Sequence, residues 1–283
     1  MALDQTGPDY PYEKNMGFFD HIDELRKRLV RISLMILVVM IAGFFYVPYI
    51  FENIILAPYK PNFWGYKFFC KMGRYFTGTD ITCWNPPALD MQSQQIQGQF
   101  VAAFKISFIL SIVVTFPYIV NQIWLFIKPA LSAKEINKTR RSLGVVSLLF
   151  FAGVLFSYYF LVPIASNFLL SYSLSDKIRN VITITSVTGF VTFMSLATGL
   201  VFEMPVLIFI LARLGMITSS ALIKRWRIAL VVIFIIAAVA TPSPDIFSQF
   251  LLAFPLILLY ILSIFIARRV ESRKAAEELT GQE

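Results

Sequence analysis

The sequence has little charge and few of the residues that enzymes use for chemistry. Only 15% of its 283 residues are charged, whereas soluble domains carry about a quarter. There is one histidine and there are two cysteines. No glycine-rich phosphate loop, metal cluster or nucleophile–histidine pair can be read, and residues 1–16 lack the apolar core of a signal peptide. We therefore expect no enzyme, no metal, no cofactor and no cleaved leader.

The sequence consists largely of long apolar segments. Hydrophobic residues make up 57% of the chain, in runs that can span a hydrocarbon core of about 30 Å. We predict an all-α fold, a single integral membrane domain over residues 1–283 with six transmembrane helices. The segments are residues 29–47, 100–127, 143–170, 187–214, 228–240 and 246–267. The fifth is short and would reach only about 20 Å as a helix.

Basic residues gather on alternate connections between these segments. Most of the 25 Lys and Arg residues lie before residue 32, in 128–141, in 213–227 and after 267. The positive-inside rule then places both termini in the cytoplasm, with residues 1–28 and 268–283 as cytoplasmic ends. The net charge of +8 thus reflects topology, and we expect no nucleic-acid partner.

The long connection of residues 50–99 lies on the opposite side in this topology. It is rich in aromatic residues, glycine and proline, and we expect it to cap the membrane surface. It also holds Cys70 and Cys83. A disulfide between them and two free thiols both remain open, since the only histidine, His21, is too distant in sequence to suggest a shared metal site.

Glu203 lies inside the apolar stretch GLVFEMPV of the fourth segment. An ionisable group at membrane depth costs roughly 2.5–3.5 kcal/mol on insertion scales, so it usually faces protein or water and has a polar partner. Glu203 therefore marks a place to look for function. The alternative is a neutral glutamate with a structural hydrogen bond.

Two cytoplasmic motifs flank the first two segments. The sequence HIDELRKRL at residues 21–29 predicts an amphipathic helix that enters the membrane, with acids before bases as the helix dipole favours. It can also be an ordinary cytoplasmic anchor. The sequence KPALSAKE at residues 128–135 ends a helix at Pro129 and offers a capping box from Ser132 to Glu135. Glu135 can be a cap, a ligand-binding acid, or both.

A third motif, TPSPDIFSQ at residues 241–249, lies between the last two segments. Its prolines predict a tight reversal, and Asp245 can cap the sixth helix. Gln249 follows one turn later on the same face. An amide in an apolar helix usually binds a polar group on another helix.

These motifs together resemble the TatC family, the multispanning subunit of the twin-arginine protein translocase. The resemblance covers residues 19–269 and lies in four motifs in the family's order: residues 21–29, 126–135, 202–205 and 241–249. It implies six helices in a curved, glove-like arrangement. It also implies a bacterial cytoplasmic membrane location and export of folded proteins, driven by the proton-motive force.

The resemblance assigns roles to single residues. Glu24 and Glu135 match acids that contact the paired arginines of a signal peptide, and Arg26 matches a neighbouring basic position. Glu203 matches a buried acid of the concave face. Pro58 matches a proline of the first periplasmic loop, while Thr241, Asp245 and Gln249 match a region where partner helices dock.

The implied partners are TatA-like and TatB-like single-span proteins, twin-arginine signal peptides, membrane lipids and further copies of the chain. Residues 60–90 depart from the family pattern in length and in carrying two cysteines. Two other function classes remain as alternatives. They are a proton-coupled transporter of a small solute, with Glu203 as relay, and a passive scaffold for single-span proteins.

Overall fold

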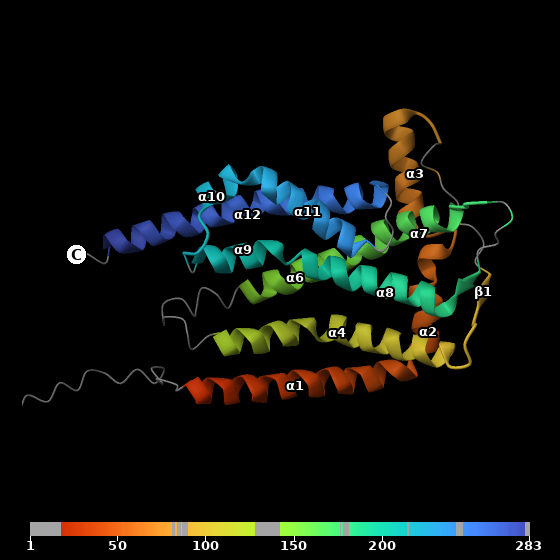
Figure 1. Cartoon of the computed structure of the whole chain (residues 1–283), viewed down its shortest axis with the longest axis horizontal. Helices are drawn as coiled ribbons and strands as arrows, with labels where there is room; N and C mark the ends of the chain where they lie inside the picture. The colour runs from red at the N-terminus through yellow and green to blue at the C-terminus, as the bar shows by residue number, and fades with distance from the viewer. Residues whose placement is uncertain are drawn as a thin grey trace, which may run out of the picture.

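The chain folds into long helices that lie roughly side by side (Figure 1). This computed structural model describes residues 18–80, 83, 86, 90–127, 142–175, 177, 181–213, 215–241 and 246–280. Five helical segments of the described chain are long and apolar enough to cross a membrane: His21–Phe45, Gly98–Phe126, Leu143–Ser171, Ile184–Arg213 and Ser248–Ser272. A shorter apolar helix spans Trp226–Ala240. The predicted all-helical membrane fold is confirmed, including the short fifth segment.

The five long segments and the shorter one contain eight α-helices. They are α1 (Phe18–Phe45), α4 (Gly98–Ile127), α6 (Ser142–Phe156), α7 (Val162–Ser171), α8 (Ile184–Val201), α9 (Met204–Arg213), α11 (Trp226–Ala240) and α12 (Ile246–Thr280). The start of α1 and the end of α12 lie at one end of the bundle (Figure 1). This arrangement agrees with an even number of crossings.

Two of the predicted spans are not regular helices. A π-helical turn, η4 (Ser157–Leu161), separates α6 from α7, and Pro163 follows it at the start of α7. Proline has no N–H and clashes with the carbonyl four residues earlier, so the wider turn adapts the helix to it. Helix α7 then continues to Ser171, close to the expected end of this segment at residue 170. The fourth span breaks at Phe202 and Glu203, between α8 and α9.

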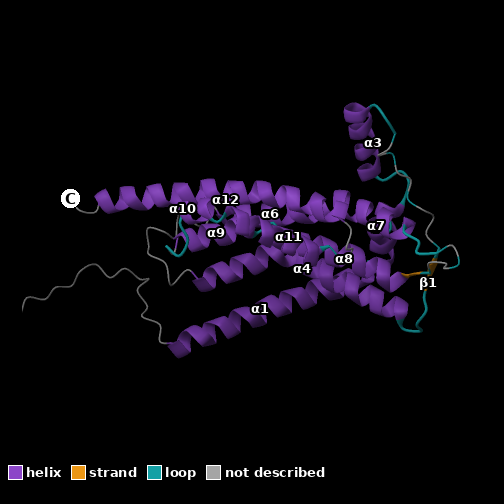
Figure 2. Ribbon diagram, turned by 45° about the horizontal axis from the view of Figure 1, so that its top comes forward, coloured by secondary structure: helices purple, strands orange, loops and turns teal. Residues whose placement is uncertain are grey.

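The other end of the bundle is covered by the connection between α1 and α4. It contains α2 (Val47–Ile50), the π-helix η1 (Phe51–Ile55), the 3₁₀ helix η2 (Ala57–Tyr59), α3 (Trp64–Thr77) and β1 (Met91–Gln92). Strand β1 pairs in parallel with β2 (Ile182–Thr183), which joins this connection to the one before α8. Figure 2 shows α3 projecting away from the bundle at this end.

Small residues bring the central helices together. A side chain added at Gly153 of α6 would lie 2.8 Å from the ring of Phe202, and one added at Gly199 of α8 would lie 2.9 Å from the ring of Phe150. Phe150 is fully buried and Phe202 is nearly so. In lipid, close packing of this kind replaces the hydrophobic effect as the force that joins helices.

The remaining element, α10 (Ser219–Lys224), lies beside the long helix α12. Its first turn is capped by Thr218, whose hydroxyl accepts a hydrogen bond from the backbone of Ala221 at 3.2 Å. Helix α12 itself continues to Thr280, well beyond the predicted end at residue 267. The end of the chain that follows residue 267 therefore begins as helix.

Candidate functional site

Glu24 lies in the second turn of α1 and pairs with Arg28 one turn later. Arg28 donates to Oε1 of Glu24 through Nε at 3.1 Å and also through Nη2. The two side chains are only 20% and 15% exposed. A spacing of four residues places both on one face of a helix, and this pair is far better shielded than the pair of Lys27 and Asp23 beside it, which are 67% and 54% exposed.

Helix α4 supplies the other wall of this site. Arg28 Nη1 donates to the amide oxygen of Gln122 at 3.4 Å. His21 stacks on the ring of Phe126, with ring centres 4.2 Å apart. These contacts fix the start of α1 against the end of α4. Residues 128–141, which follow α4 and include Glu135, lie outside the described residues.

One oxygen of Glu24 is still available. Oε2 is buried and has no hydrogen-bond partner among the described residues. A buried carboxylate oxygen without a partner loses its hydration and gains nothing in return. The site can therefore accept a further donor, and a guanidinium suits a carboxylate best because it binds with two parallel N–H groups.

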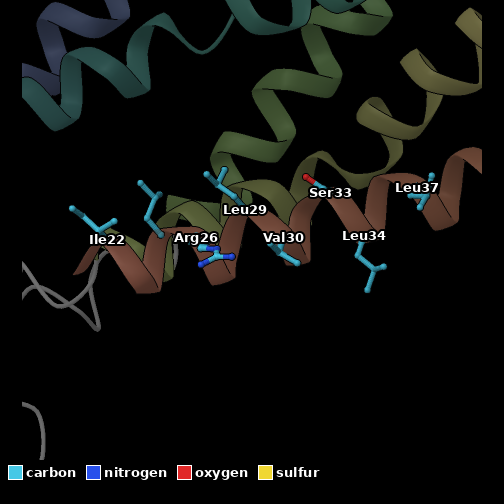
Figure 3. Close-up of a pocket in the computed structure, with 8 residues that line it drawn as sticks. Ile22, Arg26, Leu29, Val30, Ser33, Leu34 and Leu37 are labelled. Atoms are coloured by element: carbon cyan, nitrogen blue, oxygen red, sulfur yellow. The ribbon is translucent and has the colours of Figure 1, made fainter. Parts of the chain in front are cut away.

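Arg26 lies on a different face of α1. It borders a shallow pocket of about 540 Å³ whose other lining residues on α1 are aliphatic or small: Ile22, Leu25, Leu29, Val30, Ser33, Leu34 and Leu37. Figure 3 shows Arg26 among these side chains along the helix. A long basic side chain can lie along such a surface with its charge at the membrane boundary. Arg26 and Glu24 are thus not brought together.

Glu203 is a polar residue in the middle of the bundle, separate from the Glu24 site. It lies in the turn between α8 and α9 and is half-buried. Neither of its carboxyl oxygens has a hydrogen bond of normal geometry among the described residues, although the backbone of Phe150 lies beside it. The backbone of the turn is satisfied, because Val206 and Leu207 donate to the Glu203 carbonyl at 3.0 and 3.2 Å.

The third group of expected residues lies where α11 meets α12. Gln249 donates to the Phe234 carbonyl at 3.0 Å, so its amide already has a partner within the chain. It also borders an open pocket of about 320 Å³ between the two helices. Thr241 is buried and donates to the Ala237 carbonyl at 2.8 Å. Asp245 lies outside the described residues.

The remaining expected positions belong to the connection at the other end of the bundle. Pro58 is fully buried in η2, next to α7. Cys70 on α3 and Cys83 form a disulfide. Asp80 lies close to both sulfurs, but a disulfide offers no thiolate for a metal.

Comparison with known proteins decides the family. The family described as "Sec-independent protein translocase protein (TatC)" matches residues 20–255. The chain belongs to the TatC family. It is 34% identical to the TatC protein of Carboxydothermus hydrogenoformans, over 94% of this chain and 98% of that one. It is 33% identical to the TatC protein of Blattabacterium sp. subsp. Periplaneta americana, over 93% and 99%.

Solved structures give the same result. A crystal structure described as the twin-arginine translocase receptor TatC matches with a TM-score of 0.66 and 28% identity, over 89% of this chain and 99% of that one. A second, in the detergent DDM, matches with a TM-score of 0.67 over 87% and 99%. The chain is thus a multi-pass membrane protein of a protein translocase and not an enzyme. The small-solute transporter receives no support.

Reasoning from sequence missed three residues of the Glu24 site in this TatC-family chain. Arg28 lies in the motif at 21–29 itself but was given no role, and Gln122 and Phe126 contact that motif from α4. A signal for Arg28 was present, because it follows Glu24 by four residues in a predicted helix. Gln122 is an amide in an otherwise apolar helix, which also points to a polar partner.

Proposed function

We propose that this protein is the receptor for twin-arginine signal peptides and the core subunit of a translocase. It exports folded proteins across the bacterial cytoplasmic membrane and uses the proton-motive force. Both termini lie in the cytoplasm, as the distribution of Lys and Arg favours. The signal peptide meets Glu24, together with Glu135 from the adjoining connection.

The observation that carries this proposal is the state of Glu24. Its Oε1 is held by Arg28, and its Oε2 is buried without a partner among the described residues. The resident guanidinium of Arg28 orients the carboxylate through its hydrogen bonds to Oε1. An arginine of the peptide then binds at Oε2, or takes the place of Arg28. Lysine would be a poorer ligand, because it offers a point charge and no planar fork.

The test is peptide binding to the full-length protein in nanodiscs. Glu24→Gln keeps the size of the side chain and removes its charge. Hydrogen bonds to charged groups contribute about 1.5–3 kcal/mol, so we expect at least a tenfold loss of affinity for a twin-arginine peptide. A twin-lysine peptide should bind weakly to wild type and lose little further affinity in the variant.

Asp23→Asn is the matched control, since Asp23 is the neighbouring exposed acid that pairs with Lys27. It should leave the affinity unchanged. Equal affinities of wild type and Glu24→Gln for the twin-arginine peptide would show that Glu24 is not the receptor acid.

We further propose that TatA-like and TatB-like single-span helices dock where α11 meets α12, around Thr241, Asp245 and Gln249. The open pocket beside Gln249 supports this position. In this proposal the chain forms a homo-oligomer and is surrounded by membrane lipids.

The variant Gln249→Leu tests this docking surface. Because Gln249 donates to the Phe234 carbonyl, the substitution changes the shape of the surface as well as its polarity. Crosslinking of a single-span partner to α11 should fall in this variant, and unchanged crosslinking would exclude Gln249 from the docking surface.

A further inference from the structure

Helix α3 has an apolar face that the membrane-spanning bundle covers only in part. Trp64, Phe68 and Met72 follow one another at intervals of four residues, which places them on one face. Their exposures are 51%, 37% and 41%. The face beside it carries Lys67 and Lys71, both exposed. A helix with aromatic and apolar residues on one face and basic residues on the next is typical of helices that lie in a membrane interface.

The apolar face of α3 continues the lipid-facing surface of the bundle. Trp64 packs edge-on against Tyr159 and Phe160 of η4, with ring centres 5.7 and 5.8 Å apart. Trp64 also borders a pocket of about 520 Å³ whose opposite wall includes Ala152 and Leu155 of α6. Leu155 is 53% exposed within a segment apolar enough to span the membrane. The corner between α6 and α3 therefore opens toward lipid.

The position of α3 fits the boundary of the bilayer. Figures 1 and 2 both show it running across the direction of the long helices. Figure 1 shows it near the end of the bundle where α11 ends and α12 begins. Trp64 and Tyr159 meet at its base, and tryptophan and tyrosine are enriched at the level of the lipid headgroups. Lys67 and Lys71 are then close to the lipid phosphates.

The far end of α3 is held in shape by local contacts. A helix of 14 residues is marginal by itself in water. Gly78 ends α3 in the left-handed conformation, with φ of 65°, and its N–H donates to the Arg74 carbonyl at 3.1 Å. Arg74 pairs with Asp80 at 2.5 Å, and Cys70 is bonded to Cys83. The helix can thus project from the bundle as a rigid unit.

We propose that α3 is an interfacial helix that binds the phospholipid leaflet beside the bundle. Trp64, Phe68 and Met72 enter the boundary between headgroups and acyl chains, and Lys67 and Lys71 bind lipid phosphates. The ligand is the lipid surface itself, with a preference for anionic headgroups. The helix would fix the depth and tilt of the cap, independently of the signal-peptide site at the other end.

Depth-dependent fluorescence quenching tests this on the full-length protein in nanodiscs. An environment-sensitive fluorescent amino acid replaces Met72, which leaves the disulfide intact. The same amino acid at the exposed Ser93 serves as control. Lipids brominated on the acyl chains should quench the probe at position 72 strongly and at position 93 weakly. Equal, weak quenching at the two positions would place the face in water and overturn the proposal.

Charge is tested in the same preparation. In anionic phosphatidylglycerol nanodiscs the quenching at position 72 should exceed that in zwitterionic phosphatidylcholine. The variant Lys67→Gln/Lys71→Gln should lose this excess and keep the quenching that wild type shows in phosphatidylcholine. An unchanged excess would overturn the binding of phosphates by the two lysines. A probe at position 72 that is shielded from both bromine and aqueous iodide in the nanodiscs would reveal a protein contact, and would also overturn the proposal.

Discussion

Glu271 on α12 caps the first turn of α10 through Ser219. The carboxylate accepts a hydrogen bond from the Ser219 backbone N–H at 2.6 Å and another from its hydroxyl at 2.5 Å. The N–H groups of a first helical turn have no partner within the helix, and an anion there is also favoured by the helix dipole. Since the two residues are 52 positions apart, this contact joins α10 to the extended part of α12.

Replacing Glu271 with alanine should destabilise this end of the bundle. Hydrogen bonds to charged groups contribute about 1.5–3 kcal/mol, so we expect a loss near that range in the free energy of unfolding. Glu271→Gln keeps one acceptor and should recover part of the loss. Denaturant unfolding in detergent micelles measures both. Glu52→Ala, at an exposed acid on η1, is the control. Equal stability of the Glu271→Ala and Glu52→Ala variants would contradict the capping role.

This contact marks the limit of what sequence could predict. Long apolar runs predicted the spans and the short α11, because a bilayer fixes the length of a helix that crosses it. The place of Glu271 opposite Ser219 depends on how α10 packs on α12, and no periodicity encodes that. The same holds for the parallel pairing of β1 with β2, whose strands are only two residues long.

The candidate site was predictable in part for the same reason. Glu24 was found by its motif, and Glu203 by its chemical contrast with an apolar segment. The contact of Arg28 with Gln122 joins residues 94 positions apart, so it required the packing of α1 on α4. The resemblance placed Arg26 beside Glu24, but a separation of two residues turns side chains to different faces of a helix, and Arg26 borders another pocket.

Alkylation of the protein without reductant should leave Cys70 and Cys83 unmodified, because the two are bonded. Mass spectrometry of the intact protein measures this, and reduction beforehand should add two labels. The variant Cys70→Ser/Cys83→Ser should lose about 3 kcal/mol of stability in the loop that the bond closes. Hydrogen exchange should then speed up in α3 and stay unchanged in α4. Two labels without reductant would show free thiols.

Gly65 allows α3 to pack closely against the bundle. A side chain added there would lie 2.2 Å from the Tyr159 carbonyl oxygen and 3.2 Å from the ring of Pro163. Backbone cannot move aside as a flexible side chain can, so Gly65→Ala should shift α3 and cost about 1–3 kcal/mol, as overpacking usually does. Gly144→Ala is the control, since none of the described residues has an atom within 4 Å of a side chain added there. Thermal unfolding and the hydrogen exchange of α3 are measured for both variants. Equal unfolding temperatures and exchange rates would show that α3 does not pack on the bundle through Gly65.

The role of Glu203 can be resolved by two substitutions. Both of its carboxyl oxygens lack a hydrogen bond of normal geometry among the described residues. A neutral acid in this turn can act as a hydrogen-bond donor and acceptor toward a polar group that enters from a partner helix. Glutamine keeps both abilities and the size of the side chain, whereas alanine keeps neither.

We therefore expect export of a folded reporter to be nearly normal in Glu203→Gln and strongly reduced in Glu203→Ala. Both variants should bind a twin-arginine peptide as wild type does, because Glu203 lies in the turn after α8 and not beside Glu24 on α1. Immunoblots of the membrane fraction check that equal amounts of protein are present. If Glu203→Gln loses as much transport as Glu203→Ala, the side chain acts through its charge or its proton, and the hydrogen-bonding role is wrong. The sequence offers no second acid in the centre of a span that would complete a proton relay with Glu203, and for that reason hydrogen bonding is the expected outcome.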